Sequence, residues 1–408
     1  MRSEFETIRK LDEQLVAIIQ DFLLLGPLSW PKSTMQYFLK NAQQKEYALP
    51  TIEYPKRDFS DKISALKKSI KAIGTDDHPA ISFLRDTAQS YLDAYYILQG
   101  VGTPDVTEFS RTLYGSPRDT IPGYERRNVD VARYFLRVVE DYSDSLAEQP
   151  ENLTASEFKR LLLRQIARTI DPEVDTINVS VDSGISARAT AGPNYVKLRK
   201  GAKFSRSDLH QLFHHEVMTH TLTYINGRKQ PLLKSLGYNA PRTTATQEGL
   251  AVFAEYMNLS MELSRLKRIA LRIIAIDMAE KGADFIDLFR FFNRHTQNTE
   301  ESYYSTMRIF RGGQPKGGVI FYKDNVYLSG LIEVGSFFKH ATHKGFIHDI
   351  ALIFCGKLTT GDVLRLKPLA EQGHIIDPAY MPGWARRSSE LAAHLAINDL
   401  TERFRLKD

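Results

Sequence analysis

The chain has 408 residues, of which 42% are hydrophobic and 25% are charged, and its formal net charge is +5. These proportions are ordinary for a globular protein and exclude a disordered, fibrous or collagen-like chain. No apolar stretch reaches the roughly 18 residues of a membrane span, and no block of five like charges or basic run interleaved with aromatics occurs. We therefore expect neither a membrane nor a nucleic acid as partner.

Helical periodicity dominates the first 170 residues. The expected helices span residues 4–25, 61–73, 79–98, 126–146 and 156–170. The apolar part of the first one, residues 15–28, follows a stretch of mixed charge and is interrupted by polar residues and Gly26. It therefore predicts a mature amphipathic helix and not a secretory signal.

The character of the sequence changes at Asp171-Pro172. Alternating apolar residues predict strands over 176–182, 186–190 and 195–200. A helix is expected over 205–224, ended by Asn226-Gly227, and another over 247–259, after which helices dominate. These patterns predict an α+β, mostly helical fold, with a helical region over 1–170 and a catalytic region over 171–408, packed as one unit.

The most informative pattern is a group of metal-binding side chains. His215, Glu216 and His220 lie within seven residues, and Glu248 follows 28 residues after His220 (248 − 220). Two imidazoles and a carboxylate can hold Zn²⁺ and leave its fourth position open, while Glu216 can act as the general base for an attacking water. We expect His215, His220 and Glu248 as ligands of one zinc ion in a metallopeptidase.

The spacing of the two histidines carries a structural condition. In the common H-E-x-x-H motif, four residues turn about 400° along an α-helix, so both imidazoles share one face. In this chain Thr219 holds that fourth position, and five residues, or about 500°, separate His215 from His220. The motif therefore requires a wider, π-type turn, in which i→i+5 bonding restores the alignment.

Other titratable residues are assigned supporting or structural roles. Glu255 lies seven residues after Glu248 on the same helix, and we expect it to orient a ligating imidazole. His210 and His214 have the spacing of a second metal pair but are expected to support the site or lie at the surface. A further cluster lacks an adjacent acid and predicts an exposed helix end: His340, His343 and His348.

The sequence resembles a known family at three motifs in the same order. These are His215 to His220, the run Gln247-Glu248-Gly249-Leu250-Ala251, and residues 321–330, Phe-Tyr-Lys-Asp-Asn-Val-Tyr-Leu-Ser-Gly. Together they resemble the microtubule-associated tyrosine carboxypeptidase family, over roughly residues 30 to 390. The resemblance implies a gluzincin-like zinc carboxypeptidase with His215, His220 and Glu248 as ligands and Glu216 as base.

The resemblance also bears on partners. Family members that act on tubulin carry a long, basic N-terminal extension, whereas this chain begins almost directly in its first expected helix. It looks like a bacterial-type member with the QEGLA motif, so microtubules are not expected as its partner. The single cysteine, Cys355, excludes an intramolecular disulfide, which fits a reducing compartment and predicts a cytoplasmic protein.

Substrate contacts are expected around the third motif. Tyr327 is expected to donate a hydrogen bond to the oxyanion, with Tyr322 as the alternative. The terminal carboxylate of a peptide needs a cation. We expect that cation among Lys323, Arg311, Arg308 and Arg242, and we expect Tyr195 in an edge strand over residues 195–200 that pairs with substrate backbone. Lys197, Arg199 and Lys200 on that strand suit an acidic peptide.

These observations favour a zinc carboxypeptidase that removes a C-terminal residue, tyrosine or another aromatic, from a peptide or protein. Two alternatives stay open. One is a zinc endopeptidase or aminopeptidase on the same scaffold, which would lack the cation that clamps a substrate carboxylate. The other is a non-catalytic regulatory protein that retains the fold, against which the presence of the base Glu216 argues.

Overall fold

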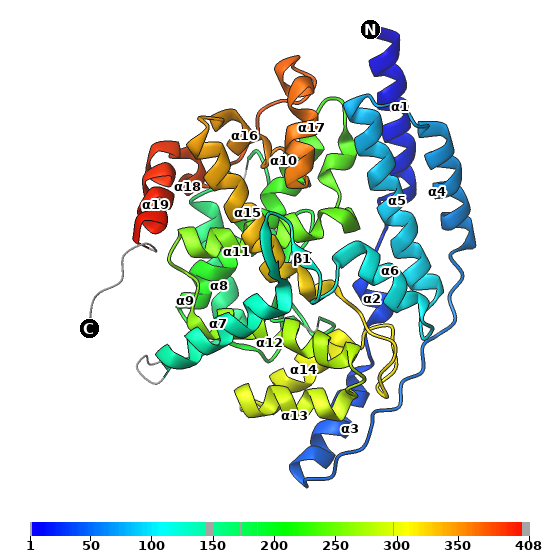
Figure 1. Ribbon diagram of the computed structural model, residues 1–408, viewed down its shortest axis with the longest axis vertical. Helices are drawn as coiled ribbons and strands as arrows, with labels where there is room; N and C mark the ends of the chain where they lie inside the picture. Colours follow the sequence, from blue (N-terminus) through cyan, green and yellow to red (C-terminus); the bar gives the residue numbers. More distant parts are fainter. Residues whose placement is uncertain (1, 144–149, 172, 186, 297, 402–408) are drawn as a thin grey trace.

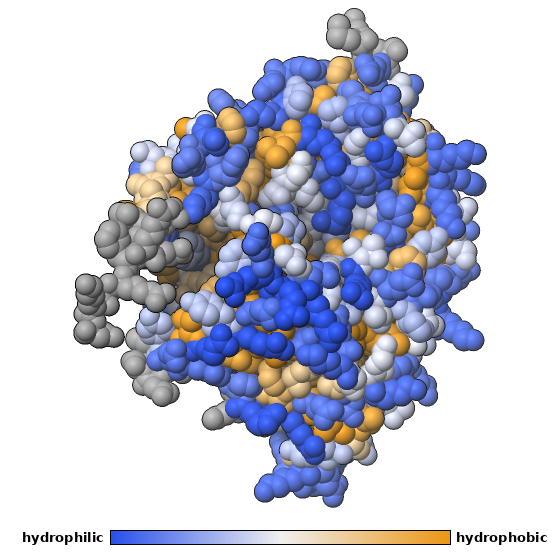
Figure 2. All heavy atoms as spheres, viewed as in Figure 1, coloured by the Kyte–Doolittle hydropathy of each residue, from blue (hydrophilic) through white to orange (hydrophobic). Residues whose placement is uncertain are grey.

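The structure is a computed structural model that describes residues 2–143, 150–171, 173–185, 187–296 and 298–401. It is mostly helical, with short strands near its centre (Figure 1). Among the described residues, no helix combines the length and the apolar character needed to cross a membrane. The face in Figure 2 is largely hydrophilic, most densely over α7 (Asn128–Ser143) and the hairpin of β1 (Thr120–Ile121) and β2 (Tyr124–Arg127).

The N-terminal helices form one flank of the molecule, where α1, α4 and α5 pack against one another (Figure 1). The helix expected over 4–25 ends at Ile19, before the polar pair Gln20-Asp21, and Pro27 lies in a separate short helix. Proline cannot donate the bond that a continuous helix needs there. The helices of the N-terminal part are α1 (Arg2–Ile19), α2 (Leu25–Leu28), α3 (Lys32–Gln43), α4 (Ser60–Ile73), α5 (Pro79–Gln99) and α6 (Asp105–Tyr114), of which α3 lies apart from the flank and contacts α14.

The small sheet has the strand order β4-β6-β5, with β4 (Asn178–Asp182) parallel and β5 (Ala189–Ala191) antiparallel to β6 (Tyr195–Arg199). The expectation that residues 195–200 form an edge strand is therefore wrong. Both edges of β6 are paired, so its backbone cannot pair with a substrate. A second, two-stranded pair joins β3 (Leu153–Thr154) to β7 (Lys203–Phe204).

Two separate apolar cores are buried in the described chain. The sheet core contains residues of α8 (Ala155–Ala167), of β4 to β7 and of the helix that carries His215 and His220, from Ala155 to Ile225. The helical core joins the N-terminal flank to the C-terminal half, from Ile8 to Ala132 and from Leu232 to Leu391. The cores thus do not divide at residue 170, because α8 packs against the sheet and the N-terminal helices pack against the C-terminal half.

The helix expected over 205–224 has three consecutive parts. These are α9 (Ser207–Leu212), the π-helix η1 (Phe213–Thr221) and α10 (Leu222–Lys229). The π-type turn required by the histidine spacing is confirmed. The expected stop at Asn226-Gly227 is wrong, since α10 continues to Lys229. Gly227 instead allows a close approach, because a Cβ there would lie 2.2 Å from the Leu236 carbonyl oxygen.

Two glycines permit the helix crossing that brings the second and third motifs together. They are Gly249 on α11 (Thr244–Met257) and Gly330 on α15 (Val326–His343). A Cβ on Gly249 would lie 2.2 Å from the Gly330 carbonyl carbon, so only glycine fits at this approach. The crossing places Glu248, in the second turn of α11, beside the residues that precede α15.

The remaining helices cover the helical core. They are η2 (Lys234–Gly237), η3 (Pro241–Thr243), α12 (Leu263–Glu280), α13 (Phe285–Thr296), α14 (Thr299–Ile309), η4 (Lys323–Asn325), α16 (Ile347–Leu352), α17 (Thr360–Glu371), α18 (Gly383–Arg386) and α19 (Ser388–Thr401). Helices α7 and α12 pack against each other, and Asp277 of α12 pairs with Arg118, Arg133 and Lys281.

Candidate metal centre

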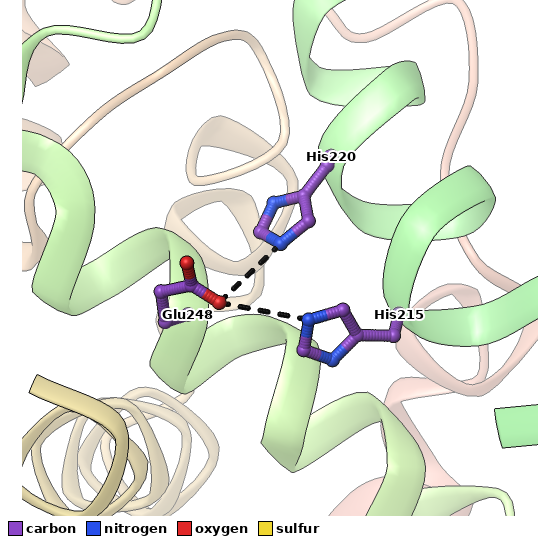
Figure 3. A group of neighbouring side chains, drawn as sticks. All are labelled: His215, His220 and Glu248. Atoms are coloured by element: carbon purple, nitrogen blue, oxygen red, sulfur yellow. Dashed lines mark ion pairs between the residues drawn. The ribbon is translucent and has the colours of Figure 1, made fainter. Parts of the chain in front are cut away.

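The structure brings His215, His220 and Glu248 together, although they come from two different helices (Figure 3). The Nε2 atoms of His215 and His220 lie 3.6 and 3.7 Å from the same carboxylate oxygen, Oε2 of Glu248. Among the described residues, this is the group of three histidine, cysteine or carboxylate side chains whose ligand atoms all lie within 4.8 Å of one another.

This arrangement fits a tetrahedral metal ion. Zinc binds imidazole nitrogen and carboxylate oxygen at about 2.1 Å, so two ligand atoms at a tetrahedral angle lie roughly 3.4 Å apart. The distances between Glu248 and the two imidazoles exceed that value by only a few tenths of an ångström. Two nitrogen ligands and one oxygen ligand suit Zn²⁺ and leave a coordination position for a reacting group.

Glu255 holds the ring of His215 from the opposite side. Its Oε1 lies 2.7 Å from Nδ1 of His215, which leaves Nε2 directed at Glu248. Glu255 is fully buried and also accepts hydrogen bonds from Gln211 and from the guanidinium of Arg265. A carboxylate that accepts the second ring proton fixes the tautomer and the orientation of a ligating imidazole.

The electrostatics of the three residues are strongly coupled. Burial lowers the pKa of His215, but hydrogen bonds to Glu248 and Glu255 outweigh it and raise that pKa to about 10. Burial opposes ionisation of Glu248, yet Lys323 and the two imidazoles hold its pKa well below the usual range. Burial lowers the pKa of His220, against the influence of Glu248. Glu248 is therefore an anion at neutral pH, the form in which a carboxylate binds a metal ion.

Lys323 binds the metal-site carboxylate itself. Its Nζ donates to Oε1 of Glu248 at 2.8 Å, whereas Oε2 faces the imidazoles. The two oxygens of Glu248 thus have separate partners. The ring of Tyr327 lies beside this pair, with Nζ of Lys323 and the guanidinium of Arg265 each 5.6 Å from its centre.

Glu216 is buried beside the first imidazole, with only 7% of its surface exposed. It lies on η1, directly after His215, and its charge acts on His215 and on Lys357. The π-type turn gives His215 and His220 one direction, while Glu216 follows immediately in the chain. The base expected from the motif therefore lies within electrostatic reach of His215.

The other expected substrate contacts lie in different surroundings. Arg242 pairs with Asp362 at 2.9 Å and bonds Thr87, so its guanidinium holds helices together in the helical core. Tyr195 lies on the central strand β6, where its backbone oxygen accepts from Gly192. These contacts show how the two residues are held in the described structure, and their role toward a substrate stays a prediction.

Two further arginines expected from sequence surround one carboxylate. Arg308 makes a two-pronged ion pair with Asp324, and Arg311 is 2% exposed nearby. Burial and the neighbouring charge of Arg308 lower the pKa of Arg311 to about 9, and a similar environment lowers that of Arg272 to about 10. Tyr322, the alternative oxyanion donor, instead donates its hydroxyl to Glu280.

The remaining expected histidines are separate from the metal ligands. Burial and His210 lower the pKa of His214 to about 4, and His210 itself is exposed. The other three lie on the exposed segment from the end of α15 into α16: His340, His343 and His348.

Two supporting residues, Arg265 and Lys357, were missed by sequence reasoning. Arg265 has helical spacing with Arg268 and Arg272 on α12, and this basic stripe is visible in the sequence. Lys357 gave no such signal. It is 2% exposed and donates to the carbonyl of His220 at 2.7 Å and to Oε1 of Gln247 at 2.9 Å. Burial lowers its pKa to about 7.

Comparisons with known proteins identify curated relatives of this chain. A relative from Homo sapiens, microtubule-associated tyrosine carboxypeptidase 1, is 28% identical over 198 residues, which cover 48% of this chain and 40% of the relative. The Mus musculus protein of the same name is 27% identical over 201 residues, 48% of this chain and 40% of its own length. The chain thus matches less than half the length of these curated relatives.

Among solved structures, metallocarboxypeptidase 1 of Trypanosoma cruzi is aligned over 99% of both chains at 13% identity, with a TM-score of 0.29, below the level at which two chains share a fold. The model of the family described as microtubule-associated tyrosine carboxypeptidase matches residues 36–402. That stretch includes the paired helices of the metal centre and the crossing of α11 with α15. The chain belongs to the microtubule-associated tyrosine carboxypeptidase family.

Proposed function

We propose that this protein is a zinc-dependent carboxypeptidase that removes the last residue of a peptide or protein chain. The observation that carries the proposal is the convergence of His215, His220 and Glu248 within 4.8 Å, beside the buried Glu216, in a member of this family. A structural zinc site is usually closed by four protein ligands and has no use for an adjacent base.

Each residue of the proposed site has a separate role in peptide hydrolysis. Zinc held by His215, His220 and Glu248 would supply Lewis acidity toward the scissile carbonyl and toward water. Glu216 accepts the proton of the attacking water and delivers it to the leaving amine. The phenol of Tyr327, at the start of α15, donates a hydrogen bond to the oxygen on which negative charge develops.

The charge around Tyr327 favours a substrate with a free carboxylate. Two cations lie against this ring, since Nζ of Lys323 and the guanidinium of Arg265 are each 5.6 Å from its centre. Lys323 also pairs with Glu248 and Arg265 with Glu255, while Arg272 and Arg308 share Asp324. A peptide C-terminus can bind such a cluster of cations through its free carboxylate.

The terminal residue that we propose is tyrosine or another aromatic, as the name of the relatives indicates. Peptides that end in tyrosine, phenylalanine, leucine or glutamate, each as free acid and as amide, separate the alternatives. We expect release of the last residue from the free acids and at least a hundredfold slower cleavage of the amides. Equal cleavage of both forms would indicate an endopeptidase or aminopeptidase.

The metal requirement is tested on the protein as purified. Elemental analysis should give about one zinc per chain, and His215→Ala should lose it. Glu248→Ala should also lower zinc affinity sharply, since it supplies the third ligand. Absence of zinc from the wild type even after zinc is added, together with no turnover of any peptide, would leave only a non-catalytic role.

A further inference from the structure

The contacts of Lys357 point to a role in assembling the metal centre. Its ammonium is buried and donates two hydrogen bonds, one to the carbonyl oxygen of His220 and one to Oε1 of Gln247. His220 is itself a metal ligand, and Gln247 directly precedes the ligand Glu248. One side chain therefore connects the two helices that carry the ligands, at the ligand of one and at the neighbour of the ligand on the other.

The connection is reinforced at its ends. Oε1 of Gln247 also accepts from the hydroxyl of Thr223 at 3.0 Å, and that hydroxyl bonds the carbonyl of Thr219 at 2.7 Å. The backbone N–H of Lys357 donates to the Leu236 carbonyl at 2.7 Å, which anchors the segment between α16 and α17 to the end of η2. Hydrogen bonds thus fix both the backbone and the ammonium of Lys357.

The chemistry of these bonds is unusual for a buried lysine. Burying an ammonium is costly unless it is well paired, and the hydrogen bonds that the described structure gives Lys357 go to a carbonyl and an amide, not to a carboxylate. A hydrophobic residue would fill the same volume at lower cost. The lysine is therefore explained by what it holds and not by the stability of the core alone.

We propose that Lys357 is a positioning residue that sets the separation between His220 and Glu248 and thereby the affinity of the centre for zinc. The proposal rests on the zinc site of the proposed function. Lys357 would act on the metal site indirectly, through its hydrogen bonds to the backbone of His220 and to the side chain of Gln247. Loss of such an outer contact in other metal sites weakens metal binding by about 10- to 100-fold.

The experiment compares zinc affinity, by competition with a chromogenic chelator, in the wild type, Lys357→Met and Lys344→Met. Lys344 is exposed at the end of α15 and is the matched control for loss of one positive charge. We expect Lys357→Met to bind zinc at least tenfold more weakly and the control to match the wild type. The visible spectrum of the Co²⁺-loaded variant should also change, because that spectrum reports coordination geometry.

Each outcome decides the proposal. A lower melting temperature with unchanged zinc affinity and Co²⁺ spectrum would mean a purely structural role and overturn it. Tighter zinc binding would mean that the lysine acts only as a nearby like charge, which also overturns it. If Lys357→Met does not fold, Gln247→Met removes the same connection from α11 and carries the same expectation. A wild type that binds no zinc would overturn the proposed function and this inference with it, whereas zinc binding that Lys357→Met leaves unchanged would overturn this inference alone.

Discussion

The two apolar cores contribute different parts of the metal centre. The sheet core carries η1 and with it His215, Glu216 and His220, all within one short motif. The helical core carries Glu248, and it also carries the supporting residues Glu255 and Lys357. One core thus supplies the imidazoles and the proposed base, whereas the other supplies carboxylates and cations that contact them. The site exists only where the two cores meet.

The chemical role of the sheet core is tested by Glu216→Gln. We expect kcat to fall by about 10²- to 10⁴-fold, the usual contribution of a general acid–base group, with zinc content unchanged. Glu371→Gln, at the exposed end of α17, is the matched control and should retain full activity. Undiminished turnover in Glu216→Gln would show that the base lies elsewhere.

The role of the helical core is tested at the crossing of α11 and α15. Gly249→Ala would place a Cβ 2.2 Å from the Gly330 carbonyl carbon, so the helices must separate and Glu248 must move. We expect the free energy of unfolding to fall by about 3 kcal/mol or more, as for severe overpacking. Gly335→Ala on the same helix α15 meets its nearest side-chain atom at 3.7 Å and should be neutral or slightly stabilising. Urea denaturation measures both, and equal stability of the two variants would contradict the close crossing.

The contact between the two cores is tested by Glu255→Gln. The amide keeps the shape of the side chain but cannot hold the Nδ1 proton of His215 as a carboxylate does. We expect zinc affinity to fall by about 10- to 100-fold, the range for loss of such a partner. Chelator competition measures the change. Unaltered affinity would show that the packing of η1 alone orients His215.

A smaller effect is expected far from the metal, within the helical core. Asp12 of α1 is fully buried and accepts from the backbone N–H groups of Lys234 and Ser235; burial raises its pKa to about 6. Between its unfolded pKa and about 6 the folded state keeps a proton that the unfolded state releases, so this contribution to stability falls as pH rises. From pH 5 to pH 7 the loss is ~1 kcal/mol.

The measurement is chemical denaturation of the wild type, Asp12→Asn and Glu4→Gln at both pH values. Glu4 is an exposed acid on the same helix and should leave the dependence intact. Asp12→Asn should remove that part of it. A variant that retains the full dependence would assign it to another buried acid.

The sequence predicted those parts of the site that depend on local spacing. Five residues between His215 and His220 required a π-type turn, and η1 provides it. The strand over 195–200 was expected at nearly the right residues, but its central position was not. Strand order depends on the parallel pairing of β4 with β6, which alternation of apolar residues does not encode.

Contacts between residues far apart in the chain could not be predicted from the sequence, for a related reason. Lys357 bonds a residue 137 positions away, and a lone lysine between Gly356 and Leu358 resembles any surface residue. The same holds for Arg242, whose charge suggested substrate but whose partner Asp362 lies in a distant helix. Helical period identifies a buried face, but it does not identify the residue that faces it.

The π-helix η1 also determines the direction in which the side chains of α10 point. Each α-helical residue turns the chain by about 100°, so deletion of Met218, which would restore four-residue spacing, would rotate α10 by that angle relative to His215. Asn226 of α10 bonds the carbonyls of Phe354 and Tyr380 and would then face away from both. The extra residue therefore sets the angle between the two ends of this continuous helix. His215 and His220 point toward Glu248, while Asn226 points toward Phe354 and Tyr380.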